Sequence, residues 1–155
     1  MLATVFVLTS TAFRAGGTIP ATVTCSGPDR SPALRWSGVP AGTRAFAIVL
    51  DDPDAKGGDG GTFVHWLGWN LAGSKRTLAA GARFPREGAN DFGRRAYGGP
   101  CPPARQRHEY RFRLYALNAP LALAAGANRA AVAAALRGHV RGSATLIGYF
   151  SSRLK

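Results

Sequence analysis

The segment His108-Glu109-Tyr110-Arg111-Phe112-Arg113-Leu114-Tyr115-Ala116 decides the fold class. Its even-numbered side chains are a histidine, two aromatics, a leucine and an alanine, and charged residues separate most of them. Successive side chains of a β-strand point to opposite faces of the sheet. The alternation therefore predicts a strand over 108–116 with one buried face and one wet face, which is typical of an antiparallel sheet.

Shorter apolar or alternating runs elsewhere predict further strands. We expect them over residues 5–7, 21–25, 34–36, 46–50, 63–71 and 144–150. The run over 46–50 is continuously apolar and too short for a helix, so it predicts a buried strand that stops at Asp51-Asp52-Pro53. Over 63–71, strand alternation places Phe63, His65, Leu67 and Trp69 on one face.

The remaining segments predict loops and little helix. Asn128 can cap a helix over 129–137, which Gly138 would end. Residues 72–100 show few periodic signals and predict a long ordered loop with at most one short strand. Many short strands, glycine-rich turns and one or two short helices near the C-terminus predict a mainly β protein, a two-sheet antiparallel β-sandwich. A chain of 155 residues suits a single domain spanning 1–155.

The charge balance is strongly basic, with 20 lysines and arginines against 8 acidic residues and a net charge of +12. The basic residues are spread from Arg14 to Arg153 without a run of five, which indicates a solvated surface rather than a binding face. We therefore expect no specific nucleic acid partner and at most weak contact with a membrane surface. Residues 2–8 are apolar but lack the basic start of a signal peptide, so the expected location is cytoplasmic.

The chain has two cysteines, Cys25 and Cys101, which are too few for a disulfide framework. In a cytoplasmic protein, two reduced thiols are the expected state. A bridge would require the fold to bring their Cα atoms within about 7 Å, and the sequence leaves that alternative open.

Two segments place acid, imidazole and phenol groups where a strand meets a loop. Asp51-Asp52-Pro53-Asp54 follows the apolar run and precedes His65, while Tyr97-Gly98-Gly99-Pro100-Cys101-Pro102-Pro103 precedes His108 and Tyr110. Asp52 is two residues after Leu50 and four after Ile48, so in a strand its side chain lies on their buried face, at the end next to the loop. If the strands that begin at 63 and at 108 run parallel, both imidazoles and the phenol meet Asp52 at one end of the sheet.

Such a constellation suits phosphate or a similar oxyanion. Two imidazoles, a tyrosine hydroxyl and the loop amides around Gly98 and Gly99 can donate hydrogen bonds. Asp52 or Asp54 would orient an imidazole, raise its pKa and keep it cationic. The alternatives are an ordinary Asp-Pro-Asp turn, a core histidine at 65 and a core aromatic at 110.

Other kinds of site fit poorly. The segment from Asp52 begins like a calcium loop, but Lys56 takes a ligand position and Phe63 stands where a glutamate belongs. The glycines over 57–61 are not followed by the Lys-Ser/Thr of a phosphate-binding loop, and no zinc or serine-hydrolase motif occurs. We therefore expect no metal and no cofactor. Cys101 is the one candidate nucleophile, and Pro100 and Pro102 leave it little room to move, so we also expect no enzymatic activity.

The chain resembles the phosphatidylethanolamine-binding protein family, in particular its bacterial branch related to Raf kinase inhibitor protein. The resemblance rests on an ordered series of short motifs: Gly17-Thr18-Ile19-Pro20, Thr24-Cys25-Ser26-Gly27, Ser31-Pro32-Ala33-Leu34-Arg35-Trp36, Gly38-Val39-Pro40, Asp51-Asp52-Pro53-Asp54-Ala55, Phe63-Val64-His65-Trp66, Asn90-Asp91-Phe92-Gly93, residues 97–103 and His108-Glu109-Tyr110. It implies a β-sandwich with a small anion pocket at one end. By the same resemblance, the pocket would be lined by Asp52, Asp54, His65, Pro102, Pro103, His108 and Tyr110.

The resemblance also implies what the protein does. It suggests a non-enzymatic binding protein for phosphate or a phosphorylated, phosphoethanolamine-like head group. The alternative is an interaction module that inhibits a kinase or a protease through the pocket-side surface. The chain departs from the family's pattern at two positions. Lys56 stands where the family usually has a proline after Asp-Pro-Asp-Ala, and Glu109 stands where an arginine is common. The oligomeric state is left open, with a homodimer among the alternatives.

Overall fold

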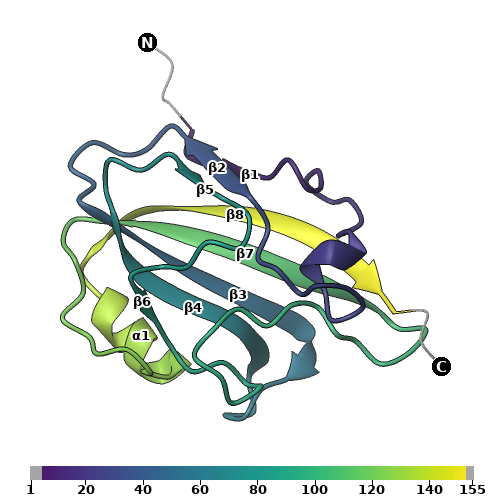
Figure 1. Ribbon diagram of the computed structural model, residues 1–155. Helices are drawn as coiled ribbons and strands as arrows, with labels where there is room; N and C mark the ends of the chain where they lie inside the picture. The colour runs from purple at the N-terminus through teal and green to yellow at the C-terminus, as the bar shows by residue number, and fades with distance from the viewer. Residues whose placement is uncertain (1–4, 153–155) are drawn as a thin grey trace.

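Two antiparallel sheets of unequal width form the computed structural model, which describes residues 5–152 (Figure 1). The narrow sheet has the strand order β1-β2-β5 and the wide sheet the order β6-β4-β3-β7-β8. This confirms the predicted sandwich. The elements are β1 (Val7–Thr9), the 3₁₀ helix η1 (Ala21–Val23), β2 (Leu34–Ser37), β3 (Ala45–Lys56), β4 (Thr62–Ala72), β5 (Thr77–Leu78), β6 (Arg86–Glu87), β7 (Arg107–Leu117), α1 (Arg129–Leu136) and β8 (Val140–Ser151).

The core between the sheets is built from alternate residues of the long strands. On β3, Phe46, Ile48 and Leu50 are fully buried against the narrow sheet, whose Trp36 ring lies 5.3 Å from that of Phe46. The even-numbered residues of β7 from Tyr110 to Ala116 join the same cluster. The alternation over 108–116 and the buried run over 46–50 are therefore confirmed.

β3 lies in the middle of the wide sheet and pairs antiparallel with both β4 and β7. β4 and β7 therefore run parallel to each other on either side of it. This confirms the expected relation between the strands that begin near 63 and 108. The end of β3 and the starts of β4 and β7 meet at one edge of the sandwich.

β3 continues past the point where the sequence predicted its end. Asp52 still pairs with Phe63, and Lys56 pairs with Thr62 after a register shift. Pro53 lies inside that irregular stretch, where its missing N–H removes no ladder hydrogen bond. The prediction that the strand stops at Asp51 was wrong because a proline is tolerated at a bulge.

β4 carries a bulge at His65. Leu50 pairs with Trp66 and Asp51 with Val64, so His65 is the extra residue on β4. Leu67 and Trp69 pack in the cluster beneath α1, whereas the His65 ring contacts Tyr110 on the other side. The expectation that Phe63, His65, Leu67 and Trp69 share one face was therefore wrong.

Local turns replace one expected strand. Residues 21–25 contain η1 instead, because Val23 N donates to Pro20 O at 3.0 Å and Thr24 N donates to Ala21 O at 3.0 Å. The first strand is Val7–Thr9 rather than 5–7, and residues 72–100 contain two short strands instead of one.

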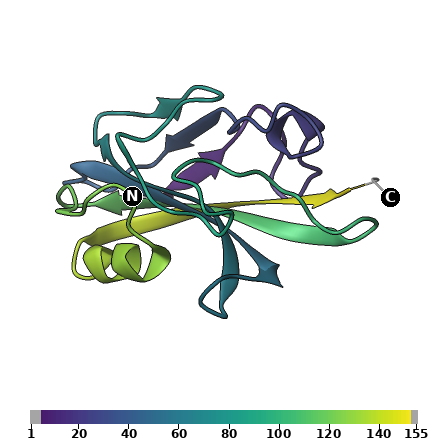
Figure 2. The ribbon, with the colours of Figure 1, turned by 60° about the horizontal axis from the view of Figure 1, so that its bottom comes forward.

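The outer face of the wide sheet carries α1, on the side away from the narrow sheet (Figure 2). Asn128 caps the helix as predicted, since its Oδ1 accepts from Ala131 N at 2.9 Å. Asp51, 1% exposed, joins α1 to the sheet: its Oδ2 accepts from Arg129 Nη2 and Arg111 Nη2, both at 2.8 Å. No helix among residues 5–152 is long and apolar enough to cross a membrane.

The Asp51 cluster predicts an acid-sensitive contribution to stability. Burial alone would raise the pKa of Asp51, but hydrogen bonds from Arg111, Thr62 and Arg129 outweigh it and lower the pKa to about 2. A folded-state pKa below the unfolded value stabilises the fold above about pH 4, and this stabilisation is lost as the pH falls toward about 2. Urea unfolding should show Asp51→Asn losing about 2 kcal/mol near neutral pH and little at about pH 2.

Asp59→Asn is the matched control, because the Asp59 carboxylate is exposed and accepts from the backbone of its own loop at Gly61. The free energy of unfolding of Asp59→Asn should match that of the wild type at every pH. An Asp51→Asn variant whose stability also parallels the wild type down to low pH would contradict the assignment.

Candidate functional site

A cavity of about 160 Å³ opens at the edge where β3 ends and β4 and β7 begin. It contains five of the seven residues expected there: Asp52, His65, Pro102, Pro103 and His108. The structure thus brings together side chains that are up to 56 positions apart. The remaining lining residues are Ala55, Phe63, Phe92 and Cys101.

Asp52 and His108 form a closely matched pair on neighbouring strands. Asp52 Oδ2 lies 2.6 Å from His108 Nδ1, and its Oδ1 accepts from Asp54 N at 2.7 Å. His108 Nε2 lies 3.0 Å from Gln106 Oε1, so both ring nitrogens have partners. The carboxylate is therefore compensated by N–H donors and does not meet an incoming anion as a bare charge.

His65 is held by a backbone carbonyl. Its Nδ1 lies 2.7 Å from Gly98 O, and because a carbonyl oxygen can only accept, Nδ1 must carry the hydrogen. Burial lowers the pKa of His65, although the carbonyl and Asp52 oppose this effect. The ring is thus neutral near neutral pH and leaves Nε2 as an acceptor, and the imidazole that Asp52 orients is that of His108.

Tyr110 lies behind the cavity wall, in contact with both imidazoles. Its ring centroid is 5.4 Å from that of His65 and 6.4 Å from that of His108. Its hydroxyl is buried and finds no hydrogen-bond partner among residues 5–152. Burial raises the pKa of Tyr110, so the hydroxyl stays protonated and can donate. An unpaired buried hydroxyl is costly unless a ligand completes it.

Asp54 has a different place from the one expected. Its Oδ2 accepts from Glu109 N at 2.8 Å, and it does not line the cavity. Its carboxylate therefore ties the end of β3 to the start of β7, and its contribution to the site is positional.

Aromatic rings that the sequence analysis missed form one wall. The centroids of Phe63, His65 and Phe92 lie between 4.9 and 5.3 Å from one another. Phe92 belongs to the Asn90-Asp91-Phe92-Gly93 motif, which carried a resemblance but no chemistry of its own. Strand alternation placed Phe63 on the same face as His65, but an apolar ring offers no hydrogen-bonding group that would have assigned it to the site.

Cys25 and Cys101 are joined by a disulfide, with their Cα atoms 5.4 Å apart. The expectation of reduced thiols was wrong, because the segment after η1 packs against residues 97–103 across 76 positions of sequence. Cys25 N also donates to Pro100 O at 3.1 Å. The bridge thus joins the cavity wall at Cys101 to a loop outside the wide sheet.

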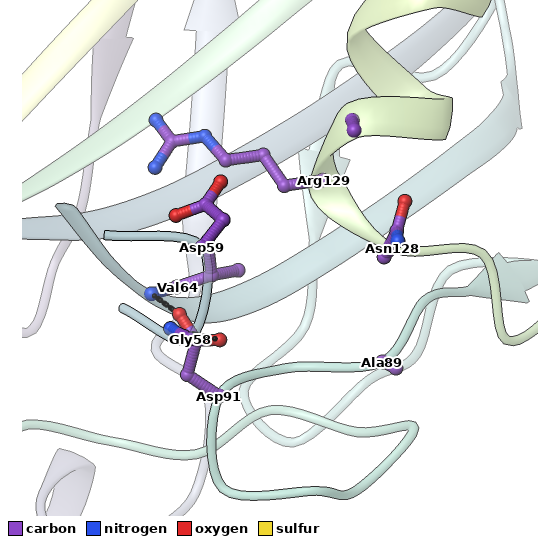
Figure 3. Close-up of a pocket in the computed structure, with 8 residues that line it drawn as sticks. Gly58, Asp59, Val64, Ala89, Asp91, Asn128 and Arg129 are labelled. Atoms are coloured by element: carbon purple, nitrogen blue, oxygen red, sulfur yellow. Dashed lines mark hydrogen bonds between the residues drawn. The ribbon is translucent and has the colours of Figure 1, made fainter. Parts of the chain in front are cut away.

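A second, larger cavity of about 270 Å³ lies between the β3–β4 loop and the start of α1 (Figure 3). Its charged groups already have partners within the protein. Asp91 accepts from Gly58 N and Val64 N, and Arg129 donates to Asp51. Asp91 therefore fixes the loop that carries Phe92. The smaller cavity is the better candidate because the Tyr110 hydroxyl beside it is unpaired.

No cluster of three side chains able to hold a metal ion occurs in the described part of the chain. Among the described lining residues, the chemistry available is that of imidazole, carboxylate and an adjacent phenol.

The unpaired hydroxyl predicts opposite effects for two tyrosine substitutions. Tyr110→Phe should raise the stability of the ligand-free protein by about 1 kcal/mol, because it removes a buried group without a partner. Tyr97→Phe is the control: its hydroxyl donates to Val23 O at 2.7 Å, so the loss should destabilise by about 1 kcal/mol. Urea unfolding measures both. A Tyr110→Phe variant that loses as much as Tyr97→Phe would mean that the Tyr110 hydroxyl is already bonded.

Comparison with known proteins agrees with this architecture. A family model described as phosphatidylethanolamine-binding protein matches residues 9–151. A UPF0098 protein of Aquifex aeolicus is 39% identical over 151 residues, covering 91% of this chain and 85% of that one.

Two solved structures have the same fold. CT736 of Chlamydia trachomatis, titled a phosphatidylethanolamine-binding protein homolog, has a TM-score of 0.89 at 33% identity and covers 96% of this chain and 99% of its own. E. coli YbcL, titled a new member of the mammalian PEBP family, has a TM-score of 0.85 at 29% identity and covers 95% and 98%. The chain belongs to the phosphatidylethanolamine-binding protein family.

Proposed function

We propose that this protein binds a phosphate-type anion, free or as a small phosphorylated head group, in the cavity between β3, β4 and β7. The observation that carries the proposal is the buried Tyr110 hydroxyl, which has no partner among the described residues and lies beside two imidazoles. Membership of a family described as phosphatidylethanolamine-binding supports the same class of ligand.

The size and polarity of the cavity favour a small ligand. At about 160 Å³, it is below the roughly 300–1,000 Å³ of pockets that enclose drug-sized molecules. The Phe63 and Phe92 rings and two prolines supply apolar walls for a short ester arm. The net charge of +12 raises the local concentration of anions around the molecule.

The polar groups can complement an oxyanion in two protonation states. The Tyr110 hydroxyl is not part of the cavity lining, so it donates only to an oxygen that reaches past the lining toward it. Neutral His65 accepts at Nε2 from a protonated phosphate oxygen, whereas a protonated His65 donates to an unprotonated one. The Asp52 carboxylate already accepts from Asp54 N and faces His108 Nδ1, which lowers the cost of placing an anion beside it.

We further propose binding without turnover. The sulfur of Cys101 is held in the disulfide, and the described lining residues include no serine, threonine or lysine. Among the described lining residues, His65 and Asp52 therefore have no side-chain hydroxyl, amine or free thiol to activate. Release of phosphate from phosphoethanolamine by the wild type, abolished in His65→Ala, would overturn this part of the proposal.

Binding should depend on His65 and Tyr110. We expect the affinity for phosphate and phosphoethanolamine, measured by calorimetry at about pH 7, to fall about tenfold or more in His65→Ala and in Tyr110→Phe. His139→Ala is the control, because His139 bonds Asn118, which follows β7 at the end away from the cavity. Unchanged affinity in both cavity variants would exclude the site.

Binding should also take up a proton. The pKa of His65 is lowered in the free protein, and an anion beside Nε2 favours the protonated ring. Sulfate, which stays dianionic, should therefore bind more tightly as the pH falls from about 8 to about 6, by at most tenfold per pH unit. His65→Ala should flatten this dependence. A profile equally steep in the variant would assign the proton to another group.

A surface beside the cavity supports a second candidate function, an inhibitory contact with a kinase or a protease. Phe92 is 39% exposed, and Arg94 lies over its ring at 5.8 Å. An exposed aromatic next to an arginine is typical of interface anchors. Arg94→Ala, at an exposed residue that does not line the cavity, should release a captured partner while Tyr110→Phe retains it, and the opposite result would favour the cavity itself.

For the location, we propose the cytoplasm, with an oxidising compartment as the competing proposal. The Cys25–Cys101 bridge favours the latter, because disulfides persist in oxidising compartments and are rare in the cytoplasm. Cell extracts made with a thiol-blocking reagent would separate the two, since they preserve the state of the bridge at lysis.

A further inference from the structure

We propose that the Cys25–Cys101 bridge is a redox modification site, opened by a low-molecular-weight thiol, and that its opening weakens the anion cavity. The inference rests on the proposed function. Cys101 is both a lining residue of the cavity and exposed, whereas Cys25 is half-buried. The disulfide is therefore a wall of the site that solvent can reach.

Backbone hydrogen bonds hold the wall on the side that precedes Cys101. Gly98 N donates to His65 O at 2.9 Å, Gly99 N donates to Asp29 Oδ1 at 2.8 Å, and Pro100 O accepts from Cys25 N. These contacts do not depend on the sulfur atoms. They would keep Gly98 in place against His65 after reduction.

The wall that follows Cys101 is held differently. Pro102 and Pro103 have no N–H to donate. In the described part of the chain, the next backbone donor bonded to another segment is Arg105 N, which donates to Ser152 O at 2.9 Å. Between these two anchors Pro102 is buried and Pro103 O accepts from Gln106 N of the same segment at 3.1 Å, and the disulfide is the covalent tie that joins this stretch to another segment.

Opening proceeds by thiol–disulfide exchange. A thiolate attacks Sγ of the exposed residue Cys101, the S–S bond breaks, and Cys25 leaves as a thiolate that takes up a proton. A second thiol attacks the mixed disulfide and releases the Cys101 thiol, so that two thiols are oxidised to one small disulfide and the bridge is reduced by two electrons.

Both products impair the cavity. The mixed disulfide places a substituent on a lining residue, and the fully reduced form frees the stretch from Cys101 to Ala104 from its covalent anchor. Removing a link that closes 76 positions of sequence also lowers the overall stability of the fold. The local effect on the cavity has to be measured under conditions where the reduced protein stays folded.

The experiment compares oxidised protein, protein held reduced with dithiothreitol, and a Cys25→Ser/Cys101→Ser variant. Thiol titration determines whether Cys25 and Cys101 are oxidised or reduced, and far-UV circular dichroism shows whether each form stays folded. Amide hydrogen exchange of the peptide over 97–107 and a sulfate titration are the two readouts. We expect faster exchange in this peptide and an affinity about tenfold lower in both bridge-free forms, with reoxidation restoring the wild type only.

The reduced wild type keeps the test valid if the double variant does not fold. Two titrated thiols with unchanged exchange and affinity would overturn the inference, as would a bridge that resists excess dithiothreitol in the folded protein. Faster exchange on reduction with no sulfate binding in either state would instead contradict the proposed function and leave the role of the bridge in holding the wall intact.

Discussion

The site depends on the position of β3 as the shared antiparallel partner of β4 and β7. Because each neighbour must run opposite to β3, their first residues are forced to the edge where β3 ends. His65 and His108 begin their strands there, and Asp52 ends its own buried face there. Backbone hydrogen bonding thus assembles the candidate site before any of its side chains interact.

The sequence predicted the parts of this arrangement that follow regular alternation. The even positions of β7 and the parity of Asp52 with Leu50 are set by strand geometry, so the buried faces and the meeting of Asp52 with His108 could be inferred. The bulge at His65 could not, because an extra residue reverses the parity of everything beyond it and leaves no signal in composition. The disulfide escaped prediction because it depends on loop packing across the whole domain.

The buried polar groups at the cavity fall into two sets, which differ in whether their hydrogen bonds are made within the protein. The Asp52–His108 pair is fully bonded within the protein, which fixes its geometry. Among residues 5–152, the Tyr110 hydroxyl instead has no acceptor. The bond that holds His65 is made by Nδ1, which leaves Nε2 as an acceptor. In the proposed binding function, the satisfied pair serves as scaffold, and the ligand would offset the cost of the unsatisfied groups.

Two adjacent aspartates on β3 lie on opposite sides of the sheet. Asp51 binds Arg129 of α1 on one side, and Asp52 pairs with His108 at the cavity on the other. A one-residue insertion or deletion upstream in β3 would exchange their sides, pushing the helix anchor into the ligand site and the site carboxylate under the helix. The spacing between the core residues and this pair is therefore rigid, and length changes in relatives or designed variants belong in the glycine-rich connection over 57–61.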